Sequence, residues 1–190
     1  MDKDKIISVK NIDSLNFRIA NDFKGCSKQL SKIYNSNIII AGPPNSGKTT
    51  MLRDIVFNLS KFKKVCVVDE RQEICSEYFD NGLMVDCLKG FKKSEGINIA
   101  IRTLSPQVIV FDEIGSIQEC ESVYNSLNSG VNVITSVHCK DIKQLMIKPI
   151  CKKLIDSMSF DYVVFLKEKA GEIDKVYKVE GRSLCEFSVF

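Results

Sequence analysis

The sequence predicts a three-layer α/β domain with a mainly parallel sheet, closed at one edge by a C-terminal antiparallel hairpin. Short runs of β-branched residues recur along the 190 residues, and most are apolar throughout, as in strands buried on both faces. Stretches with the apolar spacing of helices lie between them, and this alternation favours a parallel sheet covered on both sides. The last two runs flank a short segment that contains Gly171, which is typical of a hairpin.

Each expected element follows from the positions of its apolar residues. Strands are expected at residues 37–41, 65–68, 108–111, 131–137, 162–166 and 176–179. Helices are expected at 51–59 and 116–129, where apolar residues share one helical face. Before the first strand, a helical period runs through Leu15, Ile19, Phe23, Cys26, Leu30 and Ile33. We therefore divide the chain into an N-terminal helical segment, 1–35, and a core domain, 36–190.

Composition disfavours several classes of protein. The 27 basic and 24 acidic residues give a net charge of +3, far from the dense basic surface that makes nucleic acid the default partner. No apolar run approaches the roughly 20 residues of a membrane span, and the charged N-terminus leads into no apolar signal core. The eight cysteines form no Cys-x-x-Cys pair, and one histidine leaves no second imidazole for zinc. We therefore expect reduced thiols in the core of a cytoplasmic protein.

The strongest motif follows the first expected strand. The sequence Gly42-Pro43-Pro44-Asn45-Ser46-Gly47-Lys48-Thr49 fits the phosphate-loop pattern Gly-x-x-x-x-Gly-Lys-Ser/Thr. Its glycines permit backbone angles that turn N–H groups toward an anion, and the helix that follows adds positive potential. Lys48 is expected to reach the β- and γ-phosphates, and Thr49 to bind Mg²⁺. An ordinary glycine turn is the weaker alternative. The expected nucleotide-binding residues are Gly42, Pro43, Pro44, Asn45, Ser46, Gly47, Lys48, Thr49 and Thr50.

Two carboxylates end the expected strand at 108–111. Asp112 is placed to hold Mg²⁺ through its water shell, and Glu113 can turn toward an attacking water molecule. A hydrolase needs such a second carboxylate beside the metal ligand, whereas a kinase has less need of one. The alternative is an exposed acidic strand end. Downstream of a phosphate loop, the pair indicates nucleotide hydrolysis.

Two further strands end in polar residues, which should open onto the same site because ligands bind at the carboxyl ends of parallel strands. Thr135, Ser136 and His138 are expected to face the γ-phosphate, with His138 as its sensor, although a lone histidine is more often an ordinary loop residue. The strand at 65–68 leads into an acidic box that either serves the metal or a neighbouring subunit, or is a solvated loop. Its acids are Asp69, Glu70 and Glu73.

The order of these motifs resembles that of the type II and type IV secretion ATPases. It is more similar still to the stage III sporulation protein AA family of endospore-forming bacteria, over about residues 8 to 166. Five separated blocks carry the resemblance. They are Gly42-Pro43-Pro44-x-Ser46-Gly47-Lys48-Thr49-Thr50, Val68-Asp69-Glu70-Arg71-x-Glu73-Ile74, Lys93-Ser94-Glu95-Gly96 with Ala100-Ile101-Arg102, Val110-x-Asp112-Glu113-Ile114-Gly115, and Gly130-Val131-x-Val133-Ile134-Thr135-x-x-His138.

The resemblance implies a RecA-like P-loop ATPase core that uses ATP and Mg²⁺, with Glu113, Lys48 and His138 in catalytic roles. It implies a homo-oligomer, a hexameric ring, at the cytoplasmic face of the mother-cell membrane. The ring would work with membrane-embedded subunits of a secretion-like channel toward the forespore. Rings of this kind complete each site with an arginine from a neighbour, and Arg71 and Arg102 are the best candidates. Asn45 departs from the family pattern, in which glycine is common.

Two alternative functions remain open. A nucleic-acid-dependent RecA-like motor would carry basic loops with interleaved aromatic residues. Phe62-Lys63-Lys64 and Phe91-Lys92-Lys93 are two such spots. A nucleotide-gated scaffold would bind ATP, hydrolyse it slowly and signal through ring assembly. Stimulation of hydrolysis by single-stranded DNA would favour the motor, whereas Glu113 favours hydrolysis over a scaffold role.

Overall fold

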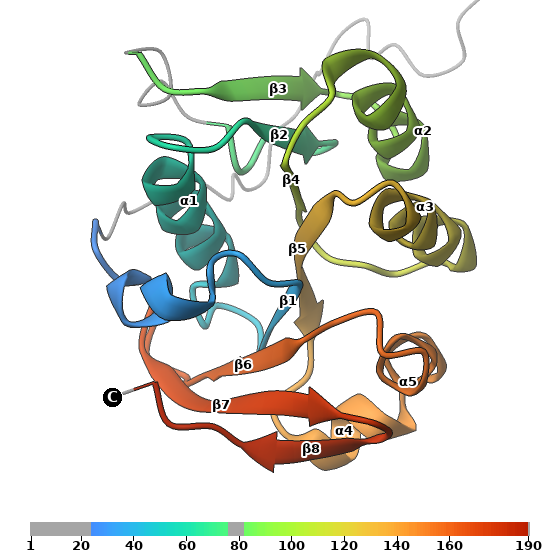
Figure 1. Cartoon of the computed structure of the whole chain (residues 1–190). Coiled ribbons are helices and arrows are strands. Elements are labelled where there is room, and N and C mark those ends of the chain that lie inside the picture. Colours follow the sequence, from blue (N-terminus) through green and yellow to red (C-terminus); the bar gives the residue numbers. More distant parts are fainter. Residues whose placement is uncertain (1–23, 76–81, 190) are drawn as a thin grey trace, which may run out of the picture.

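The computed structural model describes residues 24–75 and 82–189, which form one eight-stranded sheet with helices on both faces (Figure 1). The strand order is β3-β2-β4-β5-β1-β6-β7-β8. The strands from β3 to β6 in this order are parallel, and β7 and β8 add antiparallel to β6. The bounds are β1 Ile38–Gly42, β2 Val65–Asp69, β3 Val85–Lys89, β4 Val108–Phe111, β5 Asn132–His138, β6 Tyr162–Leu166, β7 Ile173–Glu180 and β8 Ser183–Glu186.

All six expected strands are confirmed, with β4 and β6 matching the predicted bounds and the others shifted or extended at their ends. The expected antiparallel hairpin is β6–β7. Two strands escaped prediction, β3 and β8, which lie at the two edges of the sheet. Both mix polar and apolar residues, β3 is only partly buried and β8 is mostly exposed, so neither contains the continuous apolar run that marks a central strand.

Helices cover the two faces of the sheet separately (Figure 1). On one face, α1 (Lys48–Leu59) packs Met51, Leu52 and Ile55 against the sheet, together with the 3₁₀ helix η1 (Lys28–Ile33). The other face is covered by α2 (Lys93–Ile99), the π-helical turn η3 (Ala100–Leu104), α3 (Ile117–Asn128), α4 (Ile142–Ile147) and α5 (Pro149–Asp156). The predicted helices at 51–59 and 116–129 correspond to α1 and α3, and a capping box between Ser116 and Glu119 begins α3. The three-layer α/β class is therefore confirmed.

The described part of the N-terminal segment, from residue 24 on, docks on α1 through a buried carboxylate. Asp54 accepts hydrogen bonds from the backbone N–H groups of Gly25 and Ser27, each at 2.8 Å, and from the Ser27 hydroxyl at 2.6 Å. Gly25 has a φ of 87°, and over residues 24–33 the expected helical segment consists of turns followed by η1. Leu30 and Ile33 are buried as predicted. The earlier residues of the expected period, Leu15, Ile19 and Phe23, lie outside the described residues.

Composition predicted reduced cysteines in the core and no membrane-spanning segment. All eight cysteines are free thiols, and Cys66, Cys120, Cys139 and Cys151 are buried in the core. Burial raises the pKa of Cys66 and of Cys139 to about 12, so these thiols stay protonated and act as small apolar side chains. Over residues 24–75 and 82–189, no helix has both the length and the apolar character that crossing a bilayer requires.

Candidate functional site

The phosphate-loop motif lies between the end of β1 and the start of α1. Gly47 occupies the N-cap position of α1 with a left-handed φ of 84°, and Asn45 has a φ of 63°, which asparagine tolerates better than most residues. Glycine at position 45, common in the family, would adopt the same angle. Lys48 turns back over the loop and donates hydrogen bonds to the carbonyl oxygens of Gly42 at 3.0 Å and Pro43 at 2.7 Å. The loop therefore has the curled backbone that the motif predicts.

The turn between β6 and β7 supports this loop from outside. The N–H of Gly171 donates to the carbonyl oxygen of Ser46 at 3.0 Å. A Cβ atom on Gly47 would lie 2.5 Å from the Gly171 nitrogen, closer than real Cβ contacts allow. Gly47 is thus required twice, for its backbone angle and for the close approach of the turn. The hairpin predicted only as an edge of the sheet also contacts the phosphate loop.

The expected metal ligand, Asp112, follows β4 and is buried. Its carboxylate Oδ1 lies 3.0 Å from the ammonium of Lys93, the first residue of α2. Burial raises the pKa of Asp112, and the charge of Lys93 acts in the opposite direction. Lys93 also donates to the carbonyl oxygen of Glu113 at 2.6 Å. Lys93 belongs to one of the blocks that resemble the family, but no local pattern predicts its contact with Asp112.

Glu113 and His138 meet at the carboxyl edge of the sheet. His138 Nε2 lies 3.2 Å from Glu113 Oε2, and both side chains are partly exposed. Burial lowers the pKa of His138, with the nearby Lys48 charge acting in the same direction and Glu113 opposing it. A neutral imidazole that donates from Nε2 to Glu113 leaves Nδ1 as an acceptor. The structure therefore brings together the two residues that the sequence placed at the ends of different strands.

Thr135 and Ser136 lie deeper in the sheet than expected. Both are buried; the Thr135 hydroxyl donates to the carbonyl oxygen of Asp112 at 3.2 Å, and the Ser136 carbonyl accepts from Ile114 N–H at 3.0 Å. These bonds tie the end of β5 to the segment that follows β4. The two residues hold the Asp112–Glu113 segment in place, and only His138 of the three reaches the exposed edge.

The acidic box forms the loop that follows β2, and this loop folds around the carboxylate of Asp69. Asp69 is fully buried and accepts hydrogen bonds from the backbone N–H groups of Glu73, Ile74 and Cys75 at 2.7–2.9 Å. Its carboxylate therefore shapes the loop that follows β2, while Glu70 is exposed and Glu73 is half-buried. Arg53 of α1 donates to the Glu73 carbonyl at 2.8 Å, so the loop is also attached to α1.

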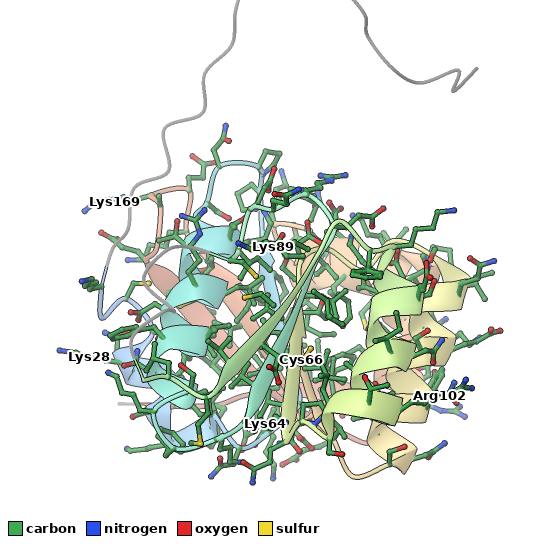
Figure 2. The ribbon with its side chains drawn as sticks, turned by 90° about the horizontal axis from the view of Figure 1, so that it is seen from above. Lys28, Lys64, Cys66, Lys89, Arg102 and Lys169 are labelled. Atoms are coloured by element: carbon green, nitrogen blue, oxygen red, sulfur yellow. The ribbon has the colours of Figure 1, made fainter. Side chains whose placement is uncertain are left out.

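The two candidate arginine fingers lie at different ends of the molecule. Arg71 is exposed in the loop that follows β2, and because β2 pairs in parallel with β4, this loop lies at the same sheet edge as Asp112. Arg102 is exposed in η3, which leads toward the amino end of β4, and Figure 2 shows it toward the Lys64 end of the strands, away from Lys89 and Lys169. Arg102 could therefore reach a site of this kind only on another copy.

The two basic and aromatic spots also lie apart. Phe62-Lys63-Lys64 leads into the amino end of β2, whereas Phe91 and Lys92 follow the carboxyl end of β3. Lys93, the last member of the second spot, is buried against Asp112. The spots form no continuous basic and aromatic track in the described part of the chain, which weakens the argument for a nucleic-acid channel.

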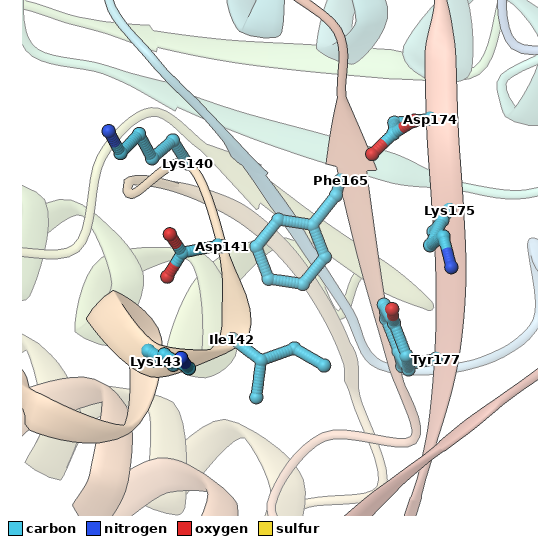
Figure 3. A pocket seen from close by; sticks show the side chains of 8 residues that line it. All are labelled: Lys140, Asp141, Ile142, Lys143, Phe165, Asp174, Lys175 and Tyr177. Carbon is cyan, nitrogen blue, oxygen red and sulfur yellow. The ribbon is translucent and has the colours of Figure 1, made fainter.

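A separate hollow of about 350 Å³ opens between the β5–α4 connection and the β6–β7 hairpin (Figure 3). Phe165 and Tyr177 form its apolar wall, with their rings 5.7 Å apart and edge-on. Lys140, Lys143 and Lys175 stand around it. None of the residues predicted for the site lines this hollow, so the candidate site is the strand edge and its loops.

The residues at this edge fit a bound nucleotide with Mg²⁺. Within the described residues, three buried side-chain atoms lack a hydrogen-bond partner: Ser46 Oγ, Asp112 Oδ1 and His138 Nδ1. Asp112 Oδ1 is ion-paired with Lys93, but its geometry is not that of a hydrogen bond. Buried polar atoms are nearly always satisfied, and these three all belong to the carboxyl edge of the sheet. Thr49 and Asp112 offer the oxygen ligands that Mg²⁺ prefers.

Solved structures with this architecture define the class. The pilus retraction motor PilT, solved with bound ADP, matches with a TM-score of 0.60 at 16% identity, over 77% of this chain and 48% of that chain. The VirB11 ATPase of the Brucella suis type IV secretion system, solved with sulphate, matches with a TM-score of 0.60 at 17% identity, over 79% and 50%. The fold is thus the RecA-like P-loop fold of the secretion ATPases.

The sequence identifies the family within this class. The model of the family Sporulation stage III, protein AA matches residues 1–184, and the chain belongs to this family. Stage III sporulation protein AA of Bacillus subtilis (strain 168) is 34% identical over 193 residues, which cover 93% of this chain. The chain spans 63% of the length of that relative and about half of each solved chain described above.

Replacing Gly47 tests the contact between the phosphate loop and the hairpin turn. Gly47→Ala should lower the free energy of unfolding by about 1 kcal/mol, because alanine disfavours the left-handed backbone at this position. The collision of the new Cβ with Gly171 should lower it by about 1 kcal/mol or more beyond that. Gly130→Ala is the matched control, because Gly130 has a φ of 75° but no atom within 4 Å of an added Cβ. Urea unfolding measures both. Equal losses for the two variants would show that the turn does not constrain Gly47.

The single histidine allows its pKa to be measured without assignment. A proton NMR titration of wild type should give a pKa for His138 below 6.5, because burial and Lys48 disfavour the imidazolium. The folded state then binds fewer protons than the unfolded state, so wild type should lose stability relative to His138→Gln as pH falls through about 6.5. A pKa above 6.5 would mean that Glu113 outweighs both effects.

Proposed function

We propose that this chain is a Mg²⁺-dependent ATPase and that the carboxyl edge of its sheet is the active site. The observation that carries the proposal is an intact phosphate loop at the same sheet edge as two buried atoms without hydrogen bonds, Ser46 Oγ and His138 Nδ1, and the buried Asp112 carboxylate, which is ion-paired with Lys93. A ligand with many acceptor and donor groups would complete them. Membership of the sporulation family and the fold of the secretion ATPases support a nucleoside triphosphate as that ligand.

The phosphate loop would bind the triphosphate through its backbone N–H groups and the N-terminus of α1. Lys48 already lies over the loop, with its ammonium on two loop carbonyls, and would exchange these for phosphate oxygens. Ser46 lies in the loop and Thr50 in the first turn of α1, so both hydroxyl groups would be near the bound triphosphate. Mg²⁺, held by Thr49 and through water by Asp112, would neutralise charge on the β- and γ-phosphates.

Hydrolysis would depend on the Glu113–His138 pair. The Glu113 carboxylate would orient the attacking water molecule and accept its proton. His138 Nε2 lies 3.2 Å from this carboxylate and would hold its direction, which leaves the buried Nδ1 as an acceptor without a partner. Because Gly42 is opposite His138 in the β1–β5 register, the histidine lies beside the phosphate loop and can respond to the γ-phosphate.

In the cell, the chain would act as the motor of a sporulation channel complex between mother cell and forespore. Its family and the motor and secretion ATPases that share its fold support this role. We propose a hexameric ring, peripheral to the inner face of the mother-cell membrane and in contact with membrane-embedded channel subunits. In such a ring, an exposed arginine, Arg71 or Arg102, would enter the site of the adjacent subunit.

Two substitutions separate binding from hydrolysis. Glu113→Gln should keep the Kd for Mg-ATP within about threefold and lower kcat by about 100-fold or more, because the amide cannot accept the proton from water. Lys48→Ala should weaken Mg-ATP binding by about tenfold or more, because the loop loses its phosphate cation. Binding is measured with a fluorescent ATP analogue and turnover by phosphate release.

Glu121→Gln is the matched control, because Glu121 is exposed on α3 and carries the same change of charge. It should retain the wild-type rate and affinity. Hydrolysis by Glu113→Gln at the wild-type rate would remove Glu113 from the catalytic role.

A further inference from the structure

Lys93 is a buried cation that the proposed reaction has not yet used. It is the first residue of α2 and is only 8% exposed. Gly96, Ile97 and Ala100 are also buried, so Lys93 lies on the face of α2 that packs against the sheet. It is at the end of that face nearest the carboxyl ends of the strands. A lysine that is this buried requires a partner for its charge.

Gly96, one turn after Lys93, allows α2 to lie close enough to the sheet for the lysine to contact the segment that follows β4. At Gly96, an added Cβ would lie 2.5 Å from Cγ1 of Val68 in β2, so α2 packs against the sheet more closely than a side chain would permit. This close approach carries Lys93 past the end of β2 to the segment that follows β4. The position of the ammonium therefore depends on packing between a helix and a strand that are distant in sequence.

The ammonium of Lys93 contacts two consecutive residues of the site. It is 3.0 Å from Asp112 Oδ1 and donates to the carbonyl oxygen of Glu113 at 2.6 Å. Thr135 holds the same segment from the other side, because its hydroxyl donates to the Asp112 carbonyl. Side chains from α2 and β5 thus hold the two peptides that flank Glu113: Thr135 binds the carbonyl that precedes it and Lys93 binds its own carbonyl.

We propose that Lys93 is a positioning residue that holds Asp112 and Glu113 in the arrangement needed for hydrolysis, an inference that rests on the proposed ATPase function. Its ammonium directs the carboxylate of Asp112 and fixes the backbone from which the Glu113 side chain extends to His138. Lys93 is nearly inaccessible, and its ammonium is engaged by an ion pair with Asp112 and a hydrogen bond to the Glu113 carbonyl, so it acts through these two residues and not as a ligand of the phosphates.

Replacing the lysine by a side chain of similar length without charge tests this role. Lys93→Met should lower kcat by about 100-fold, the cost of a small misplacement of reacting groups, while the Kd for Mg-ATP stays within about threefold. Lys92→Met is the matched control, since the adjacent Lys92 is exposed, and should leave both constants unchanged. A folded Lys93→Met protein with wild-type kcat would overturn the proposal, and so would a loss confined to ATP affinity.

A second measurement covers the case in which Lys93→Met does not fold, because it leaves the buried Asp112 carboxylate unpaired. Melting temperatures are compared for wild type, Lys93→Met, Asp112→Asn and the double variant. The proposal predicts that the double variant melts at a higher temperature than Lys93→Met, because the neutral amide needs no counter-ion. Strictly additive losses, or a double variant that also fails to fold, would overturn it.

These melting temperatures need no nucleotide. They therefore decide whether Lys93 holds the Asp112 segment even if the wild-type chain proves unable to hydrolyse ATP. Conversely, a wild type that hydrolyses ATP together with a folded, fully active Lys93→Met protein would leave the proposed function intact and reject the role of Lys93.

Discussion

The position of β1 within the sheet is the constraint on which the site depends. β1 pairs in parallel with β5 on one side and β6 on the other, in registers that place Gly42 opposite His138 and Ala41 opposite Phe165. Because β5 pairs in turn with β4, the two acids that follow β4 end at the same edge. Three segments far apart in the sequence thus bring a phosphate loop, a pair of carboxylates and a histidine together, as expected where parallel strands end.

Most of the buried charged side chains among the described residues lie at this edge, with Asp54 on α1 as the exception. Lys48 and Lys93 are both buried here, and each ends on oxygen atoms of the strand ends: loop carbonyls for Lys48, Asp112 and the Glu113 carbonyl for Lys93. Buried charges persist only where such partners are provided. Within the part of the chain that the structure describes, the buried side-chain atoms without hydrogen bonds lie at the same edge, and departures from full satisfaction are expected where a ligand binds.

Much of the fold and the core of the site follow from local patterns. The bounds of β4 and β6 were predicted to the residue, because their runs are apolar throughout, and the phosphate loop has a fixed spacing. The edge strands β3 and β8 lack that signal. Lys93 was not predicted, because its contact with Asp112 depends on how closely Gly96 approaches Val68, a tertiary detail that no local pattern contains. The hydrogen bond from Thr135 to the Asp112 carbonyl was likewise not predicted, because it joins two strands that are distant in sequence.

Hydrogen–deuterium exchange with and without a non-hydrolysable ATP analogue and Mg²⁺ tests the central claim most directly, because it locates a ligand without requiring turnover. The account predicts that the ligand slows amide exchange in the phosphate loop, residues 42–50, and in the segments around Asp112 and His138. It predicts no comparable change around the hollow lined by Lys140, Phe165 and Tyr177. Unchanged exchange in the phosphate loop, or protection confined to that hollow, would contradict it.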